Sequence, residues 1–445
     1  MPFLSHIYVP SNARMESSIL YQNAQSTVIL IDIPRSLEAA QHLSPPSPSQ
    51  PTSSSPSPSS SRRRIISTPA LLHPYPSLEP KTPKARANFN QRLGVPSINE
   101  LLLRKHVEFA LREIGERYKG EEWCLGRVIE ERNVNGVENS RRKRVRGDED
   151  QRPEAADSAH PHPQDNNRQL GEEIMNPDGL FFTNPSPSQI SLNIQFPDEQ
   201  QPKQVHIPPH STLLSGPLSS TLPTFTSSAS SPSSTSKESS GFSLITLDPP
   251  WPNRSARRSS KYTLSPNISS LLSSLPLQNH LSEDGVIAVW VTNRESFREM
   301  LLGSEGECGD RGLFAHWGVQ LAEEWVWVKT TVKGELVFDL EGGWRRPWEV
   351  LLVGRQHSEG SGQGEVKRRI IAGVPDLHSR KPNLKGLFEK LFFKEELRNG
   401  EDKVGEKTYE ALEIFARNLT AGWWSWGDEV LKFQGKECWV DTEEG

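Results

Sequence analysis

The stretch Phe242-Ser-Leu-Ile-Thr-Leu-Asp-Pro-Pro-Trp251 contains the most informative local pattern of the chain. Its apolar run predicts a buried strand over 242–247, and the double proline ends the strand because proline has no backbone N–H for a sheet. The turn that follows presents carbonyl oxygens and the Asp248 carboxylate, without a backbone donor at Pro249 or Pro250. Trp251 adds a flat apolar face on which a nucleobase can stack.

A turn with these groups accepts hydrogen bonds, and the exocyclic amine of adenine has two N–H bonds to donate. Donation of both hydrogens localises the nitrogen lone pair, which favours attack on an electrophilic methyl group. The residues therefore indicate methylation of adenine at N6. The alternative is an ordinary strand-to-turn junction with a core tryptophan, and the acid directly before the prolines argues against it.

The composition of the 445-residue chain is uneven, which favours one main domain in its second half. Tryptophan lies at and after Trp251 except for Trp123, whereas most prolines precede residue 241. Three cysteines without a CxxC pair favour neither a disulfide framework nor a zinc site, so we expect no metal. The net charge of −5 leaves nucleic-acid binding to local basic patches. Without a signal peptide or a long apolar run, we expect an intracellular protein with no membrane contact.

The N-terminal half alternates between short patterned segments and low-complexity segments. The expected division is a possible added edge strand of the main sheet in 1–43, a disordered Ser/Pro-rich linker in 44–84, a helical accessory element in 85–132, a disordered charged linker in 133–168, a partly ordered linker in 169–240 and the catalytic domain in 241–436.

Two features of this half suggest roles. Apolar residues at helical spacing follow Ser97, a good helix cap, so we expect a helix that packs on the catalytic domain; binding of RNA or of a partner protein is the alternative. The basic run from Ser140 to Arg146 predicts nuclear localisation. A solvated loop of a cytoplasmic protein, or a phosphate contact, explains that run as well.

From Gly241 onward, strand and helix patterns alternate, which is typical of an α/β sheet with crossover helices. A helix over 384–392 is predicted by apolar spacing behind Asn383, which can cap it. The expected strands are 242–247, 286–291, 325–328, 348–353 and 412–416.

Polar residues follow several of these strands, where an open α/β sheet binds its ligands. Lys381 precedes a helix N-terminus, which makes it an anchor for a carboxylate or phosphate. S-adenosylmethionine needs such an anchor for its methionine carboxylate, an acid for its α-ammonium group, and polar side chains for its ribose. Lys381 fits the role of the carboxylate anchor, and Asp248 fits the role of the acid for the ammonium group. Arg417 and Asn418 fit the role of the polar side chains at the ribose. Each of them, like the neighbouring His378, also has a plain alternative as a solvated rim or loop residue.

Together these segments resemble the adenine N6-methyltransferases with an Asp-Pro-Pro-Trp motif, a family that includes the catalytic subunit of the mRNA methyltransferase. The match tightens toward the methyltransferase-like protein 4 branch and covers most of residues 241–435. It is carried by Asp248 to Trp251, Trp290-Val-Thr-Asn-Arg294, Glu324-Trp-Val-Trp-Val-Lys329, Leu377-His-Ser-Arg-Lys-Pro382, Ile414-Phe-Ala-Arg-Asn-Leu419 and Gly422-Trp-Trp-Ser-Trp-Gly-Asp-Glu-Val-Leu-Lys-Phe-Gln434.

The resemblance implies a Rossmann-like class I methyltransferase fold in which the catalytic motif precedes the cofactor-binding segment. It implies that Asp248 to Trp251 hold the target amine. The implied binding residues for S-adenosylmethionine are Asp248, His378, Ser379, Lys381, Arg417, Asn418, Asp428 and Glu429. Asp428 stands where the family has asparagine, so it can accept from ribose hydroxyls but cannot donate as an amide does.

By resemblance the substrate is adenosine, or 2′-O-methyladenosine, in a small nuclear RNA. DNA adenine is the alternative substrate, and a catalytically silent RNA-binding scaffold, with a protein partner on the N-terminal region, is the alternative role. A zinc deaminase is excluded because its His-x-Glu and Pro-Cys-x-x-Cys motifs are missing, whereas a small-molecule or protein methyltransferase stays open. The expected substrate-binding residues are Asn253, Arg254, Arg257, Arg258, Lys261, Asn293 and Lys329.

Overall fold

The fold is taken from a computed structural model that describes residues 17–43, 62–76, 82–84, 97–130, 174–197, 199–229, 241–252, 268–303, 311–341, 345–356, 365–377, 380–393 and 409–442. Some of the predictions above concern other parts of the chain. Outside the described residues lie the segments 44–61 and 131–173, the second of which contains the basic run. The loop that contains Arg254 to Lys261 and the pair His378 and Ser379 lie outside them as well.

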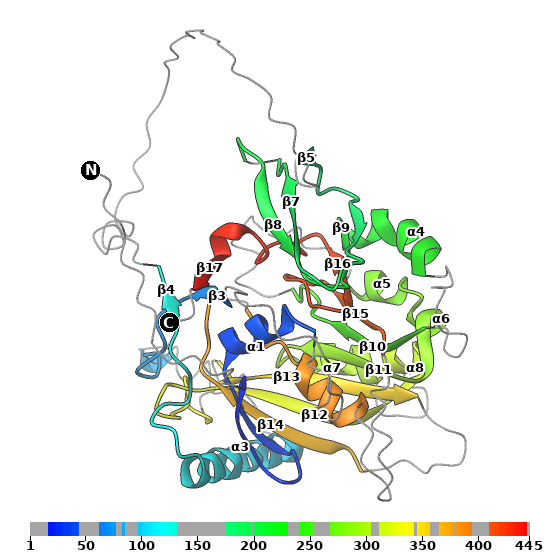
Figure 1. The fold of residues 1–445 in the computed structure, drawn as a ribbon. Coiled ribbons are helices and arrows are strands. Elements are labelled where there is room, and N and C mark those ends of the chain that lie inside the picture. Colours follow the sequence, from blue (N-terminus) through cyan, green and yellow to red (C-terminus); the bar gives the residue numbers. More distant parts are fainter. Residues whose placement is uncertain are drawn as a thin grey trace, which may run out of the picture.

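A mixed sheet of eleven strands forms the centre of the described part of the molecule (Figure 1). The strands lie in the order β1 (Ile19–Gln22), β2 (Val28–Ile31), β14 (Lys367–Gly373), β12 (Val319–Lys329), β13 (Trp348–Gln356), β11 (Leu281–Val291), β10 (Phe242–Leu247), β15 (Ala411–Ile414), β16 (Trp423–Gly427), β9 (Thr212–Ser215) and β6 (Phe181–Thr183).

The α/β class predicted from the sequence is confirmed, and the five predicted strands correspond to β10, β11, β12, β13 and β15. Strand β10 is parallel to both of its neighbours, β11 and β15, whereas β13 is antiparallel to β11 and β12. The carboxyl ends of β10, β11, β12 and β15 therefore meet at one edge of the sheet, together with the start of β13.

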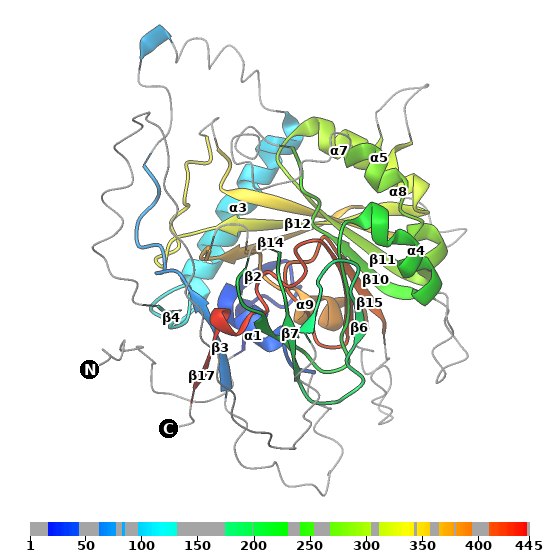
Figure 2. The same ribbon diagram turned by 90° about the horizontal axis from the view of Figure 1, so that it is seen from above.

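Helices cover both faces of this sheet, as Figure 2 shows from above. One face packs against α3 (Ile98–Arg117), α4 (Leu218–Ala229), α5 (Ile268–Ser273), α7 (Glu295–Leu302) and α8 (Gly312–His316). The other face packs against α1 (Ile33–Ala40) and α9 (Lys385–Phe388). Alternate residues of β10 serve the two faces: Ile245 and Leu247 belong to the first core, and Leu244 belongs to the second.

Residues 1–43 do add a strand, β2, to the main sheet, but β2 is not the edge strand that was predicted, because β1 pairs with its outer side. The run Val28-Ile-Leu-Ile31 is buried along its whole length and pairs in parallel with β14, while β1 pairs with its outer side. Ile33 begins α1, whose N-cap Asp32 accepts a hydrogen bond from the backbone N–H of Arg35 at 2.9 Å.

Two predicted linkers contain regular structure, and this corrects the domain boundaries. Residues 44–84 include β3 (Arg62–Ser67), which forms a small sheet with β4 (Val128–Ile129) and β17 (Trp439–Thr442). Residues 169–240 supply β6 and β9 to the main sheet, α4 to its face, and a sheet of β5 (Ile174–Met175), β7 (Ile190–Ile194) and β8 (Lys203–Ile207). The catalytic sheet thus extends beyond residues 241–436.

Ion pairs explain why β3 and β14 lack an apolar pattern. In β14, Arg368 lies opposite Glu324 of β12 and donates to it at 2.7 Å, and Arg369 donates to Glu323 at 2.6 Å. In β3, Arg64 donates to Glu38 of α1 at 2.9 Å. Paired charges let these polar residues occupy strands in the protein interior.

The two remaining helix predictions hold in part. Ser97 caps α3 by accepting from the backbone N–H of Glu100 at 3.2 Å, and the helix ends at Arg117. The helix predicted over 384–392 is α9 followed by a π-helix, Glu389–Phe393, and Asn383 accepts from the backbone N–H of Lys385 at 2.9 Å. Within the described residues, every helix is too short or too polar to cross a membrane.

Candidate active site

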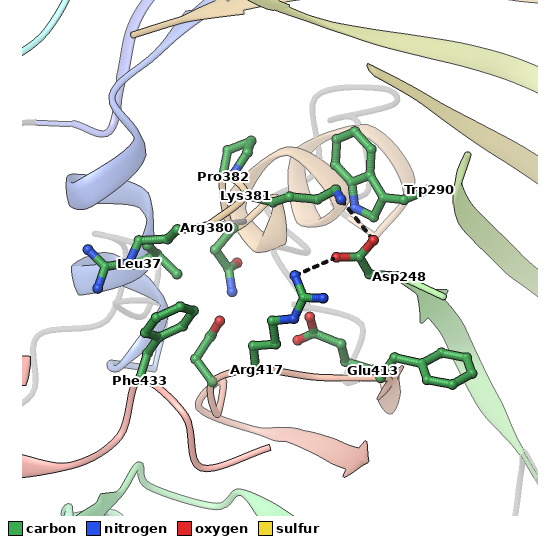
Figure 3. Close-up of a pocket in the computed structure, with 12 residues that line it drawn as sticks. Leu37, Asp248, Trp290, Arg380, Lys381, Pro382, Glu413, Arg417 and Phe433 are labelled. Carbon is green, nitrogen blue, oxygen red and sulfur yellow. Dashed lines mark hydrogen bonds and ion pairs between the residues drawn. The ribbon is translucent and has the colours of Figure 1, made fainter. Parts of the chain in front are cut away.

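An open pocket of about 440 Å³ lies at the carboxyl ends of β10 and β15, on the sheet face that α1 and α9 cover. Its residues come from segments far apart in the sequence, as Figure 3 shows. They are Leu37, Asp248, Trp290, Arg380, Lys381, Pro382, Asn383, Glu413, Phe415, Arg417, Asn418 and Phe433. This edge of an α/β sheet is where such folds usually bind ligands.

Asp248 directly follows β10, and its backbone N–H still donates to the carbonyl of Ile414 in β15 at 3.2 Å. The next two residues have no N–H, and the N–H of Trp251 turns back to the carbonyl of Pro249 at 2.8 Å. The Asp248 carboxylate therefore faces the pocket, and no backbone N–H of its own turn lies beside it. This agrees with the acceptor-rich turn predicted from the sequence.

Lys381 brings positive charge to Asp248, with 2.8 Å between Nζ and Oδ1. It also lies 3.1 Å from Oε2 of Glu349 and 5.2 Å from the centre of the Trp290 ring. An ammonium group has three N–H donors, so these two carboxylates leave one for a ligand. Burial alone would lower the pKa of Lys381, but Asp248 and Glu349 raise it above its usual value, and the group stays charged.

Glu349 is a site residue that the sequence analysis missed. It is the second residue of β13, and it joins Lys381 to Lys329, whose Nζ lies 2.5 Å from Oε1. Burial alone would raise the pKa of Glu349, but the two ammonium groups lower it to about 2. A lone acid in the run Trp-Glu-Val-Leu-Leu-Val was the available signal, since a buried strand rarely keeps an unpaired charge.

Arg417 reaches the same pocket from the segment after β15. Its Nη1 lies 3.6 Å from Oδ2 of Asp248, and its Nε donates to Glu429 at 3.0 Å. Phe415, between the strand and Arg417, has a φ of 61°, a left-handed conformation that is rare for a bulky residue. This backbone turn directs the chain after β15 back toward Asp248.

The structure thus brings together Asp248, Lys381, Arg417 and Asn418 from the predicted set. Glu429 touches the pocket through its ion pair with Arg417, whereas Asp428 is exposed and does not line it. Ribose or adenine contacts by Asp428 and Glu429 stay predictions. Asn253, like His378 and Ser379, lies outside the described residues.

Trp251, predicted as an open face for a base, is instead part of the core. Only 6% of it is exposed, its indole N–H donates to the carbonyl of Trp290 at 2.7 Å, and its ring lies 4.7 Å from that of Phe297. The sequence could not show this because the ring packs against β11 and α7, which follow much later in the chain. The indole holds the catalytic turn against β11.

Two of the predicted substrate-binding residues also have partners within the protein. The Asn293 amide donates to the carbonyl of Trp348 at 2.6 Å, which fixes the end of β11 to the start of β13. Lys329 is held by Glu349 and by the ring of Trp327, 4.6 Å away. A role of either residue in substrate binding stays a prediction.

The segment that carries Lys381 is held by parts of the N-terminal half. Arg380 donates to Asp376 at 2.6 Å, and Arg127 donates to the carbonyls of Val374 and Pro375 at 2.9 and 3.0 Å. From α1, Ser36 accepts from the backbone N–H of Asn383 at 3.0 Å. These contacts fix both sides of Lys381.

The fold and the pocket together define an α/β protein with a site for a small charged ligand. Carboxylates, cations and aromatic rings converge at one sheet edge. Among the described residues, no group of three or more His, Cys, Asp or Glu side chains is arranged to hold a metal ion.

Comparison with known proteins narrows this class. Residues 242–429 match the family model MT-A70. The chain is 35% identical over 435 residues to the N6-methyladenosine RNA methyltransferase MTA1 of Cryphonectria parasitica, an alignment that covers 97% of this chain and 96% of the relative. The chain belongs to the MT-A70 family of methyltransferases.

Two further relatives align with less than half of this chain. The N(6)-adenine-specific methyltransferase METTL4 of Mus musculus is 35% identical over 215 residues, which is 46% of this chain and 41% of that protein. The DNA N6-methyl methyltransferase of Caenorhabditis elegans is 29% identical over 201 residues, which is 45% of this chain and 48% of that protein. The predicted family and its likeness to METTL4 are confirmed.

Proposed function

We propose that this protein transfers a methyl group from S-adenosylmethionine to N6 of adenosine in RNA, in a Rossmann-like methyltransferase fold. The observation that carries the proposal is the meeting of Asp248, Lys381 and Arg417 in one pocket of a chain from the MT-A70 family. Asp248 precedes the other two by more than a hundred residues, so the catalytic motif comes before the cofactor-binding segment, as the resemblance implied.

The residues of the pocket fit S-adenosylmethionine, which supplies an electrophilic methyl group when bound. Lys381 has one N–H donor left for the methionine carboxylate. Arg417 and Asn418 are polar groups suited to ribose hydroxyls, and the rings of Trp290, Phe415 and Phe433 provide apolar contact. This donor set supports the cofactor expected from the sequence.

Asp248 orients the target amine in this proposal. Its Oδ2 lies 3.6 Å from Arg417, too far for a close hydrogen bond, so this oxygen has capacity to accept an N–H. As the amine nitrogen gains positive charge during methyl transfer, the carboxylate stabilises that charge within a partly buried site. The adenine must leave a base stack or come from a single strand to reach Asp248.

RNA is the favoured substrate because the relative named for RNA methylation aligns with nearly the whole chain. The relative named for DNA methylation aligns with less than half, so DNA adenine is the second candidate. Within RNA, adenosine or 2′-O-methyladenosine of a small nuclear RNA is our first choice. A silent scaffold is disfavoured by the three charged residues of the pocket, since a scaffold needs none of them.

The test is methyl transfer from labelled S-adenosylmethionine to adenine-containing RNA and DNA oligonucleotides of the same sequence. We expect Asp248→Ala and Asp248→Asn to lower kcat by about 10²-fold or more, because both remove the charge that positions the amine and stabilises its nitrogen. Asp284→Asn, an exposed site on β11, is the control and should retain full activity.

Near-normal turnover of both Asp248 variants would refute the proposed role of this residue. Faster methylation of DNA than of RNA would assign the alternative substrate. No transfer to either, with no calorimetric heat for S-adenosylmethionine, would support the scaffold.

A further inference from the structure

The segment between β3 and α3 lies along the loop that follows β12, at the carboxyl edge of the sheet. The backbone N–H of Tyr75 donates to the carbonyl of Val337 in this loop at 3.0 Å, and the N–H of Val337 donates to the carbonyl of Lys329 at 3.2 Å. Lys329 ends β12 and is joined through Glu349 to Lys381 of the pocket. Tyr75 is therefore anchored at the same edge of the sheet as the pocket.

Two aromatic rings and a guanidinium group lie together at this place. The centre of the Tyr75 ring lies 5.3 Å from that of the Phe338 ring, with 32° between the two planes. Arg345, from the other end of the same loop, lies over the Phe338 ring with its Cζ atom 5.8 Å from the centre. Tyr75 is 47% exposed, and Arg345 is exposed as well. We call these three residues the aromatic-arginine surface.

The charge of Arg345 is not used within the described part of the protein. Its guanidinium group has no ion pair or hydrogen bond with another described residue. The adjacent Arg346 differs, because it pairs with Glu100 of α3 and lies over the buried ring of Trp348. A guanidinium group with one face on a ring keeps its second face and its N–H groups for a ligand. Arg345 therefore has capacity to bind one.

An unpaired nucleobase fits a surface of this kind. Bases of single-stranded RNA stack on aromatic rings and on the planes of Arg guanidinium groups. Two exposed acids of the same loop, Asp339 and Glu341, reduce the local attraction for phosphate groups. The flat faces of Tyr75 and Arg345 are therefore better suited to a base than to the RNA backbone.

We propose that Tyr75, Phe338 and Arg345 bind an unpaired base of the substrate RNA that flanks the target adenosine. The proposal rests on the function proposed above, and it extends substrate binding to the N-terminal half of the chain. Trp251, the ring first expected to stack a base, is buried, whereas Tyr75 presents an exposed ring at the same edge of the sheet. A base held there keeps the strand over the pocket while the adenosine turns toward Asp248.

The first measurement is the KM of methyl transfer to a single-stranded RNA oligonucleotide with one central adenine. We expect Tyr75→Ala to raise this KM about fivefold or more at unchanged kcat, because the base loses its stacking partner while the pocket stays intact. Tyr75→Phe keeps the ring and should keep the native KM, whereas Arg345→Ala should raise it. Affinity for S-adenosylmethionine and melting temperature should stay native in all three variants, since Tyr75 and Arg345 lie outside the pocket.

Phe109→Ala is the matched control. Phe109 is 58% exposed on α3, and Arg112 lies over its ring at 5.6 Å, so these two residues form the same kind of aromatic-arginine pair. His106, three residues earlier, lies 3.1 Å from Arg368 at the start of β14, away from the carboxyl end of that strand. We expect the native KM in this variant, because its ring lies far from the pocket.

Abasic scanning identifies the contacted base directly. Each nucleotide beside the adenine is replaced in turn by an abasic residue, which removes the base and keeps the phosphate. In the native chain we expect one position, or two adjacent positions, at which binding measured by fluorescence anisotropy weakens about fivefold or more. In Tyr75→Ala the same replacement should have little effect, because the base has already lost its stacking partner.

A loss of RNA affinity in Tyr75→Ala that couples to no abasic position would overturn the proposal, since Tyr75 would then act through the fold alone. An unchanged KM in Tyr75→Ala would also overturn it, and would leave the exposed ring to a protein partner. Both results contradict only this inference, as long as the native chain methylates the RNA. Absence of methyl transfer by the native chain contradicts the proposed function instead.

Discussion

Opposite charges alternate across the carboxyl edge of the sheet from Lys329 to Lys432. The order is Lys329, Glu349, Lys381, Asp248, Arg417, Glu429 and Lys432, and each neighbouring pair lies within 3.6 Å. Such a row fixes Asp248 in the absence of ligand, because Lys381 and Arg417 hold its carboxylate on two sides. A ligand group can then replace one of these contacts without leaving a buried charge unpaired.

Glu349→Gln tests the importance of this row for stability. The folded-state pKa of Glu349, about 2, lies below its ordinary value of 4.5, so its ion pairs stabilise the fold above about pH 4.5 and lose this effect as the pH falls toward 2. We expect the variant to unfold with about 1–3 kcal/mol less free energy at pH 7. We also expect a smaller loss of stability between pH 5 and pH 3 than in the native chain.

Urea unfolding at pH 7, 5 and 3 measures both effects. Glu108→Gln, which breaks the exposed 2.7 Å pair with Lys105 on α3, is the control and should change the free energy of unfolding by less than about 1 kcal/mol. Equal pH dependence in the Glu349 variant and the native chain would show that the ion pairs of Glu349 do not support the fold.

Helix α1 is the element that joins the N-terminal segment to the pocket. Leu37 lines the pocket, Ser36 holds the segment of Lys381, and Glu38 accepts from Arg64 and from the backbone N–H of Ile65 in β3. Its C-cap Gln41 donates to the carbonyl of Leu419 at 2.9 Å. The helix is therefore a structural support for both halves of the site.

Gln434 completes the connection at the far end of α1. Its amide donates to Gln41 at 3.1 Å and to the carbonyl of His206 at 2.5 Å, and it accepts from the backbone N–H of Leu419 at 3.2 Å. Because this fully buried side chain satisfies groups from three segments, we expect Gln434→Ala to lower the free energy of unfolding by about 2–4 kcal/mol.

Chemical denaturation checks this expectation, with Gln204→Ala on the exposed side of β8 as the control. A loss below about 0.5 kcal/mol for Gln434→Ala would mean that water replaces the amide at no cost. In that case α1 would depend on its apolar contacts alone.

The whole molecule is built around a sheet to which separate parts of the chain contribute. On one side β2 pairs with β14, and on the other β9 pairs with β16, so strands from before residue 241 complete both sides of the catalytic sheet. Without them, β14 and β16 become edge strands with buried apolar side chains and unpaired backbone groups. The smallest folding unit is therefore larger than the segment that matches the family model.

The fragment 241–436 tests this conclusion. We expect it to aggregate or to unfold without cooperativity, and to give no calorimetric heat with S-adenosylmethionine, because it lacks α1 and both flanking strands. The fragment 17–442 should unfold cooperatively near the melting temperature of the full chain. If the shorter fragment melted cooperatively within a few degrees of the longer one, the N-terminal strands would be accessory.

The sequence alone was sufficient for what depends on local chemistry. The period of apolar residues gave the five strands of the catalytic half, prolines without N–H groups marked the end of β10, and Ser97 marked the start of α3. Asp248, Lys381 and Arg417 could be selected because each follows a strand or precedes a helix, where a sheet presents its ligand groups.

Tertiary structure alone decided which groups those residues meet. Glu349 and Glu413 look alike in the sequence, each a single acid in an apolar strand, yet one lies between two lysines and the other faces the pocket without a partner. Trp251 lost its predicted open face in the same way, because α7 and β11 cover its ring. Local pattern determines the backbone of a segment, but the environment of a charge or a ring depends on neighbours that are distant along the chain.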